Sequence, residues 1–271
     1  STATAKRVMA ACAETLTPVL MECGGKDAMI VDDDADVVAA ADAALWGGMA
    51  NAGQTCIGIE RVYVTERSYD GFLAALKEKV AKVEAGTSYG NITMPSQVDI
   101  IRDHIADALS HGGTTVAGGH IEGTLVEPTV LVDTPEHSRA VQEETFGPTL
   151  TVTKVSSVDE AVELANATSY GLAGAVFSKR RGMEIARRLR AGMTSINAVQ
   201  AFAGIPSLPF GGVGESGFGR IHGEDGLREF TRAKAITKQR MKPLLALTTF
   251  DRTPRADAML VKVVRFLYGR R

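Results

Sequence analysis

Short apolar runs alternate along the chain with segments in which apolar residues recur every three or four positions. The apolar runs, which are typical of strands, lie at 28–31, 61–64, 114–117, 128–132, 149–155, 174–177 and 194–196. Helical spacing occupies 36–49, 66–83, 95–110, 158–166 and 181–190. Strands that alternate with helices predict an α/β fold, in which a parallel sheet carries helices on both faces.

Further elements are predicted near the two ends. Ser1 and Thr2 are typical of a helix N-cap, so a helix over 3–15 is expected, followed by a strand near 17–21. A helix is expected over 225–234 and another over 256–268. The last is too short to span a bilayer. We expect it to dock against the body of the protein or a sister subunit, because apolar helix faces need cover; a membrane-surface role is the alternative.

Composition narrows the class of protein. The 271 residues have a formal net charge of −2, which does not suggest a nucleic-acid partner. The three cysteines, Cys12, Cys23 and Cys56, are an odd number without metal-type spacing, which favours a reducing compartment. We find no signal peptide and no apolar run of 18 residues. The expectation is a soluble, cytoplasmic protein.

Cys56 is the first candidate for chemistry. It follows Gly53-Gln54-Thr55 in a predicted turn between a helix and a strand, where rigid elements can hold a nucleophile. A buried structural thiol is the alternative, because free cysteine is among the most buried residue types.

Four motifs occur in a fixed order. They are Glu22-Cys23-Gly24-Gly25-Lys26, Gly53-Gln54-Thr55-Cys56, Glu-Glu-Thr-Phe-Gly-Pro at 143–148 and Pro-Phe-Gly-Gly at 209–212. Together they resemble the aldehyde dehydrogenase superfamily, and the resemblance extends from Ser1 to about Lys238. It implies the catalytic-domain part of such an enzyme, with most of the dinucleotide-binding domain absent.

The resemblance also implies a division of the chain. Residues 1–24 would form the last helix and strand of the dinucleotide-binding domain, 25–215 the catalytic domain, 216–240 a return segment with a helix, and 241–271 a tail helix. The family's oxyanion-hole asparagine would lie outside the chain. We therefore expect little or no dehydrogenase activity from residues 1–271 alone, and a homo-oligomer for the full-length enzyme.

The implied chemistry is the oxidation of an aldehyde to a carboxylic acid. The Cys56 thiolate would attack the aldehyde, hydride would pass to NAD or NADP, and Glu22 would act as general base on the water that hydrolyses the thioester. The backbone N–H of Cys56 is a candidate donor to the oxyanion.

Cofactor contacts follow from the same resemblance. Glu144 matches the residue that holds the nicotinamide ribose hydroxyls, and Phe146 matches the ring beside the nicotinamide, with core packing as the alternative. Ser1 matches a residue near the pyrophosphate, at a helix N-terminus with free N–H groups. Gln97 and Asn197 are weaker matches, to a ribose contact and to an asparagine ahead of the substrate loop; Asn197 fits a turn equally well.

The chain departs from the family pattern at two positions and leaves the substrate open. Cys23 stands where leucine is usual, and Ile221 stands where many members have a second glutamate. The loop 199–207 carries no Lys or Arg, which favours an apolar or aromatic aldehyde. Against this, the surroundings of Cys56 and the basic C-terminal helix resemble succinate-semialdehyde dehydrogenases of the actinobacterial type.

Two other functions are weighed against the oxidoreductase: a cysteine hydrolase that uses Cys56 with a base such as His222, and a non-catalytic fragment that binds a partner. Two further patterns are set aside. The run 32–34 of three aspartates is interpreted as the anionic start of a helix rather than as a metal site. The Gly-x-Gly-x-x-Gly run at 212–217 lacks the preceding strand that a dinucleotide fingerprint needs.

Overall fold

The computed structural model describes residues 1–241, 243, 249–251 and 253–269. These residues form two compact units, 1–231 and 232–271, and each is described by itself. The boundaries predicted at residues 24 and 215 stay predictions.

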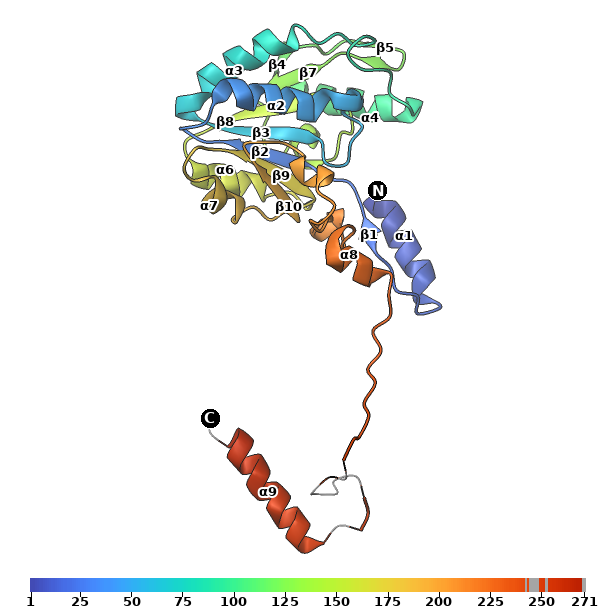
Figure 1. Cartoon of the computed structure of the whole chain (residues 1–271). Coiled ribbons are helices and arrows are strands. Elements are labelled where there is room, and N and C mark those ends of the chain that lie inside the picture. The colour runs from blue at the N-terminus through green and yellow to red at the C-terminus, as the bar shows by residue number, and fades with distance from the viewer. Residues whose placement is uncertain (242, 244–248, 252, 270–271) are drawn as a thin grey trace. The chain divides into compact units, whose positions relative to one another are not determined.

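A seven-stranded sheet forms the centre of the first unit (Figure 1). Its strands run in the spatial order β10 (Met193–Ile196), β9 (Ala173–Phe177), β2 (Asp27–Val31), β3 (Ile59–Thr65), β8 (Thr149–Val155), β7 (Thr129–Val132) and β4 (Thr114–Ala117). The four central strands β9, β2, β3 and β8 are buried along almost their whole length, as a parallel sheet covered on both faces requires.

Sequence analysis predicted a parallel sheet, and the sheet is parallel except at one edge. Its edge strand β4 pairs antiparallel with β7, whereas the other neighbours pair in parallel. Only a small hairpin of β5 (Ile121–Glu122) and β6 (Leu125–Val126) separates β4 from β7 along the chain. So short a connection returns the chain in the opposite direction, because a parallel pair needs a crossover of a dozen or more residues.

Helices cover both faces of the sheet, as predicted. On one face α2 (Val37–Met49), α3 (Glu66–Val80) and α4 (Pro95–Ser110) contribute to the largest apolar core. On the other face α6 (Val158–Ala165) and α7 (Gly182–Ala186) pack over a second cluster that includes Ile30 and Val176. The short α5 (Arg139–Gln142) was not predicted.

The segments beside the sheet differ from expectation in detail. Helix α1 (Thr2–Ala13) forms as predicted, but the strand expected near 17–21 is reduced to β1 (Met21–Glu22), which pairs antiparallel with β11 (Gly217–Phe218) outside the main sheet. The glycine-rich run 212–217 holds only a 3-10 turn (Gly214–Ser216), so no helix opens there. Helix α8 (Gly223–Glu229) is earlier and shorter than predicted.

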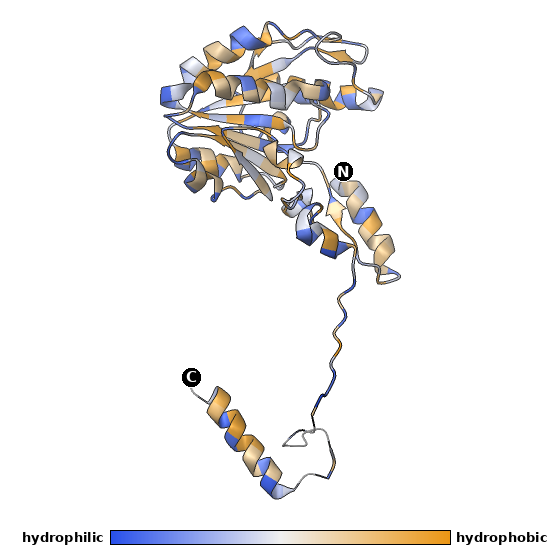
Figure 2. Ribbon diagram, in the orientation of Figure 1, coloured by the Kyte–Doolittle hydropathy of each residue, from blue (hydrophilic) through white to orange (hydrophobic). Residues whose placement is uncertain are grey.

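The second unit contains one helix among its described residues, α9 (Pro254–Tyr268). Thr253 caps it, because its hydroxyl accepts from the backbone N–H of Ala256. This helix carries both apolar and polar residues (Figure 2). In the described part of the chain, every helix is too short or too polar to cross a bilayer.

Candidate active site

A left-handed turn carries the chain from α2 to Cys56. The φ angles of Asn51, Ala52 and Gly53 are 55°, 57° and 69°, a conformation that residues other than glycine rarely adopt. Gln54 stabilises the turn, since its side-chain amide donates to the Asn51 carbonyl at 3.0 Å and accepts from the backbone N–H of Thr93 at 2.8 Å. The strain is thus balanced by polar contacts that fix the approach to Cys56.

Glycine at position 53 allows close contact between two of the sequence motifs. A Cβ atom there would lie 2.1 Å from the carbonyl oxygen of Gly147, which is far inside contact distance. The backbone before Cys56 therefore rests directly on the 143–148 segment.

The structure brings Glu22 and Cys56 together. The Glu22 carboxylate lies close enough to the Cys56 thiol for each side chain to shift the pKa of the other. Burial, then the charge and hydrogen bond of Glu22, raise the pKa of Cys56 to about 12. Burial also raises the pKa of Glu22 above its usual value, partly offset by the thiol. At neutral pH the proton therefore rests on sulfur, with a carboxylate placed to take it.

Apolar side chains surround the far side of the thiol. Cys56 packs against a buried cluster that consists of Ile57, Leu172, Ala173, Met193, Phe202 and Phe210, together with Ile221. In the described part of the chain, no protein acceptor takes the backbone N–H of Cys56. This N–H is consequently free to donate to an oxygen on a carbon bonded to the sulfur.

The contacts of His222 and Cys23 are with residues other than Cys56. The His222 ring lies 5.6 Å from the ring of Phe210, whereas the partner of the Cys56 thiol is Glu22. Cys23 is buried, and its backbone N–H donates to the Ser216 carbonyl at 3.1 Å. Burial is the main reason that the pKa of Cys23 is raised.

Glu144 reaches the turn that follows Glu22. One of its carboxylate oxygens accepts from the backbone N–H of Gly25 at 3.1 Å. A Cβ atom on Gly24 would lie 1.8 Å from the same oxygen, so glycine at this position lets the carboxylate approach the backbone. Burial, and secondly the charge of Glu60, raise the pKa of Glu144 to about 7.

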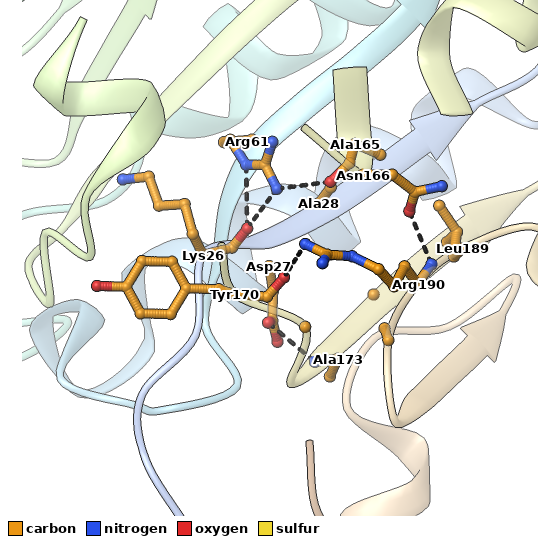
Figure 3. Close-up of a pocket in the computed structure, with 13 residues that line it drawn as sticks. Lys26, Asp27, Ala28, Arg61, Ala165, Asn166, Tyr170, Ala173, Leu189 and Arg190 are labelled. Carbon is orange, nitrogen blue, oxygen red and sulfur yellow. Dashed lines mark hydrogen bonds between the residues drawn. The ribbon is translucent and has the colours of Figure 1, made fainter. Parts of the chain in front are cut away.

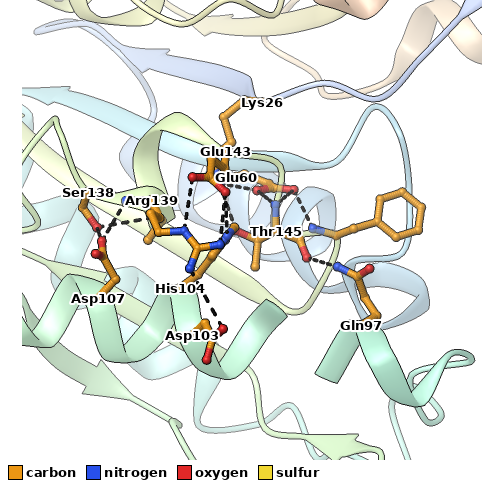
Figure 4. A network of polar contacts seen from close by, with 12 residues as sticks. Lys26, Glu60, Gln97, Asp103, His104, Asp107, Ser138, Arg139, Glu143 and Thr145 are labelled. Atoms are coloured by element: carbon orange, nitrogen blue, oxygen red, sulfur yellow. Dashed lines mark hydrogen bonds and ion pairs between the residues drawn. The ribbon is translucent and has the colours of Figure 1, made fainter. Parts of the chain in front are cut away.

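A buried network positions the segment around Glu144, and Figure 4 shows its members. Glu60 accepts from the backbone N–H groups of Thr145 at 2.9 Å and of Phe146 at 3.0 Å, and it forms an ion pair with Lys26. Phe146 is half-buried, and its backbone is in the left-handed region, with a φ of 49°. The ion pair thus anchors both the Glu22 turn and the Glu144 segment.

Sequence analysis missed Glu60 and its network. Glu60 lies in β3, four residues after Cys56, and is buried with an exposed fraction of 5%. His104 joins the network by a 3.0 Å contact between its Nδ1 and the hydroxyl of Thr145. A charged residue inside a strand-like run was the available signal, since such a residue is rarely buried without a partner.

The other three predicted site residues are Ser1, Gln97 and Asn197, and each has its own contacts. Ser1 caps α1, because its hydroxyl accepts from the backbone N–H of Thr4 at 3.4 Å. The Gln97 amide donates to the Thr145 carbonyl at 2.8 Å. Asn197 instead fits a turn, because its side chain bonds both backbone groups of Ser178.

A water-sized cavity of about 20 Å³ lies behind the Glu22 turn (Figure 3). Asp27 faces it, with one carboxylate oxygen that accepts from the Ala173 N–H and another that has no protein partner. Arg61 donates to the Lys26 carbonyl and to the Ala165 carbonyl. These contacts support the turn from below and do not include Glu22, Cys56 or Glu144.

The aspartate run 32–34 forms ion pairs rather than the start of a helix. Asp32 pairs with Arg181 at 2.5 Å, and Asp34 pairs with Arg180 at 2.9 Å. The N-cap of α2 is Asp36, and the first turn of that helix holds no acidic residue. The predicted dipole role is therefore wrong, because arginines from the loop after β9 reach these carboxylates.

Comparison with known proteins identifies relatives along most of the chain. Residues 1–236 match the model of the aldehyde dehydrogenase family. A 4,4'-diapolycopene aldehyde oxidase of Methylomonas is 37% identical over 93% of this chain and 47% of its own length. A protein of Mycolicibacterium smegmatis, provisionally named an NADP+-dependent succinate-semialdehyde dehydrogenase, is 35% identical over 100% of this chain and 55% of its own.

Solved structures agree with these matches. Betaine aldehyde dehydrogenase of Staphylococcus aureus, in complex with NAD+, is 36% identical with a TM-score of 0.80, over 85% of this chain and 48% of its own. An aldehyde dehydrogenase of Mycobacterium tuberculosis, complexed with NAD+, is 32% identical with a TM-score of 0.81, over 86% of this chain and 50% of its own. The chain thus spans about half the length of the relatives it matches. By its motifs, its fold and these matches, the chain belongs to the aldehyde dehydrogenase family.

Proposed function

We propose that this chain carries the covalent chemistry of an NAD(P)-dependent aldehyde dehydrogenase, with Cys56 as nucleophile and Glu22 as general base. The observation that supports this most is the proximity of the Cys56 thiol and the Glu22 carboxylate, each of which shifts the pKa of the other. The two residues come from different motifs and different elements. A structural thiol has no need of a carboxylate as its partner.

The first step is addition to the aldehyde. Glu22 takes the thiol proton as sulfur bonds to the carbonyl carbon, and the C=O electron pair moves to oxygen. The free N–H of Cys56 donates to the resulting oxyanion. When bound, NAD+ or NADP+ would accept the hydride that this carbon then loses, which leaves an acyl group on sulfur.

The second step is hydrolysis. Glu22 first releases the thiol proton to solvent. It then removes a proton from water as the water oxygen bonds to the acyl carbon, and it returns that proton to sulfur when the C–S bond breaks. The products are a carboxylic acid and the Cys56 thiol. A raised Glu22 pKa suits this role, because a carboxylate of higher pKa is a stronger base.

The Glu144 segment fits the ribose of a dinucleotide. One oxygen of the half-buried Glu144 carboxylate accepts from the Gly25 N–H, and the other has no protein partner in the described part of the chain. A ribose hydroxyl is the kind of donor that such an oxygen accepts. We propose Glu144 and Phe146 as the residues that hold the nicotinamide riboside, and Ser1 as a contact at the helix N-terminus near the pyrophosphate.

An uncharged, apolar aldehyde is the substrate class that the surroundings of Cys56 favour. The cluster beside the thiol includes Phe202 and Phe210, whose ring centroids are 6.2 Å apart. The relative that oxidises a diapolycopene aldehyde is consistent with this, whereas the succinate-semialdehyde relative argues for an anionic substrate. A ratio of kcat/KM for hexanal over succinate semialdehyde above 1 supports the apolar class, and a ratio below 0.1 contradicts it.

The central test is Glu22→Gln in the protein as its source organism makes it, supplied with aldehyde and NAD+ or NADP+. We expect steady-state turnover to be lost while an acyl group builds up on Cys56, detected by peptide mass spectrometry. Glu122→Gln, an exposed glutamate on β5, is the matched control and retains turnover. Full steady-state activity of Glu22→Gln disproves the assignment.

A further inference from the structure

Side-chain charge is distributed very unevenly between the two units. Residues 232–271 hold eleven lysines and arginines and only two aspartates, a net charge of +9. Residues 1–231 hold the rest of the 30 basic and 32 acidic residues, a net charge of −11. The overall charge of −2 therefore conceals a strongly basic tail, and a charge asymmetry of this kind is typical of segments that bind a polyanionic surface.

Helix α9 carries the apolar part of this tail. At 100° per residue, a continuous arc is formed by Phe266, Met259, Val263, Ala256, Leu267, Leu260 and Val264. No residue of the helix is buried, and Phe266 and Leu267 are exposed by 78% and 61%. The arc covers nearly half of the helix surface, so α9 presents an unpartnered apolar face.

Basic residues lie at the border and on the opposite side of this arc. Arg255 and Lys262 flank the edge that Phe266 forms, and Arg265 lies further round. Long basic side chains in such positions place their stems beside apolar groups and their charges in water. The same arrangement lets a helix lie in the interface of an anionic bilayer, with its apolar face among the acyl chains.

The first residues of the second unit have the same character. Lys234, Lys238 and Arg240 are exposed, and so are Ile236 and Met241, by 79% and 83%. Each Lys or Arg near an anionic lipid surface contributes roughly 1 kcal/mol of attraction. Nucleic acid would use the positive charge but not the apolar arc. A lipid surface uses both.

We propose that residues 232–271 bind the surface of an anionic lipid bilayer, with α9 lying in the interface rather than crossing it. This inference is independent of the chemistry proposed for Cys56.

The test is co-sedimentation of the full 271-residue chain with vesicles. We expect binding to vesicles of equal phosphatidylglycerol and phosphatidylcholine, little binding to pure phosphatidylcholine, and severalfold weaker binding when salt rises from about 50 to about 300 mM. Failure to sediment with the anionic vesicles overturns the proposal, and so does equal binding to the neutral ones.

Two matched variants separate lipid insertion from simple charge attraction. Leu267→Asp and Ala258→Asp change the charge by the same amount, but Leu267 lies in the apolar arc and Ala258 lies on the polar side. We expect Leu267→Asp to weaken vesicle binding at least about thirtyfold and Ala258→Asp at most about fivefold, because only the first loses apolar burial. Equal weakening by both contradicts insertion.

Size-exclusion chromatography and RNA binding distinguish the other occupants. If the arc is covered by a second copy, Leu267→Asp lowers the oligomeric state without vesicles present, and the proposal fails. If the tail binds single-stranded RNA more tightly than anionic vesicles, and both variants weaken this equally, the proposal also fails. We expect neither result.

Discussion

The sulfur of Cys56 and the carboxylate of Glu22 each alter the proton affinity of the other. Glu22 raises the pKa of the thiol by its charge and by its hydrogen bond, although burial is the larger cause. A thiol with a pKa of about 12 holds almost no thiolate at neutral pH, and the thiolate is the form that reacts with alkylating agents.

Replacing Glu22 by Gln removes the negative charge, so the pKa of Cys56 falls. We expect Cys56 in Glu22→Gln to react severalfold faster with iodoacetamide at pH 8 than in the parent chain, as measured by peptide mass spectrometry. Cys12, which is remote from Cys56 in sequence, serves as the internal reference within each sample. An unchanged or slower rate at Cys56 means that the two side chains do not interact.

Glu144 gives a prediction about stability and pH. Its pKa is raised from 4.5 to about 7 in the folded protein, so between these values the folded state binds more protons than the unfolded state. The free energy of unfolding therefore falls, by at most about 3 kcal/mol from this residue, as pH rises through that window.

Glu144→Gln removes this dependence and keeps an oxygen for the Gly25 N–H. The free energy of unfolding of the variant, minus that of the parent, should therefore increase from pH 4.5 to pH 7.5. Urea unfolding at the two pH values measures this difference. A variant that loses stability relative to the parent over that range contradicts the raised pKa.

At the scale of residues, sequence motifs pointed to Glu22, Cys56, Glu144 and Phe146, and their roles stay predictions. The structure places Glu22 near Cys56 and Glu144 against Gly25. Glu60 could not be found in the same way. Its role depends on strand β3 running beneath the 143–148 segment, and nothing local in the sequence specifies that partner. The raised pKa values were equally out of reach, because burial is a property of packing.

The turn before Cys56 is the element whose geometry is most constrained. Gly53→Ala would place a Cβ atom 2.1 Å from the Gly147 oxygen on a residue with a positive φ. We expect a loss of at least about 2 kcal/mol in the free energy of unfolding, measured with urea. Gly204→Ala is the control, since a Cβ atom there has nothing within 4 Å. Equal stability of the two variants contradicts the tight contact.

The buried ion pair joins strand β3 to the Glu22 turn. Glu60→Gln leaves Lys26 charged, buried and without its partner, so we expect a loss of about 3 kcal/mol in urea unfolding. Adding Lys26→Met to the same chain removes the unpaired charge and recovers at least about 1 kcal/mol. Additive losses in the double variant mean that the two groups are not coupled.

At the scale of elements, periodicity predicted the strands and helices of the sheet layer, because each buries an apolar stripe or run. It failed where tertiary contacts decide. Strand β1 is limited to two residues by its pairing with β11, and the direction of β4 is set by the hairpin that follows it. The helix expected over 181–190 stops at Ala186, where tight turns lead into β10.

At the scale of the whole molecule, the first unit holds the proposed site residues, and the basic second unit holds α9. The sequence indicated both, since the family pattern fades near Lys238 and the tail becomes basic and amphipathic beyond it. The chain spans about half the length of the matched relatives, and the proposed nucleophile and base both lie in its first unit.

The most direct measurement tests whether an acyl group forms on Cys56 and is hydrolysed with Glu22 as the base. It needs no dinucleotide. The 271-residue chain is incubated with p-nitrophenyl acetate, and acetylated peptides are quantified by mass spectrometry. The account predicts that acetyl-Cys56 accumulates in Glu22→Gln, turns over in the parent and is absent in Cys56→Ala. Acetylation confined to other residues, or equal persistence in parent and Glu22→Gln, would contradict it.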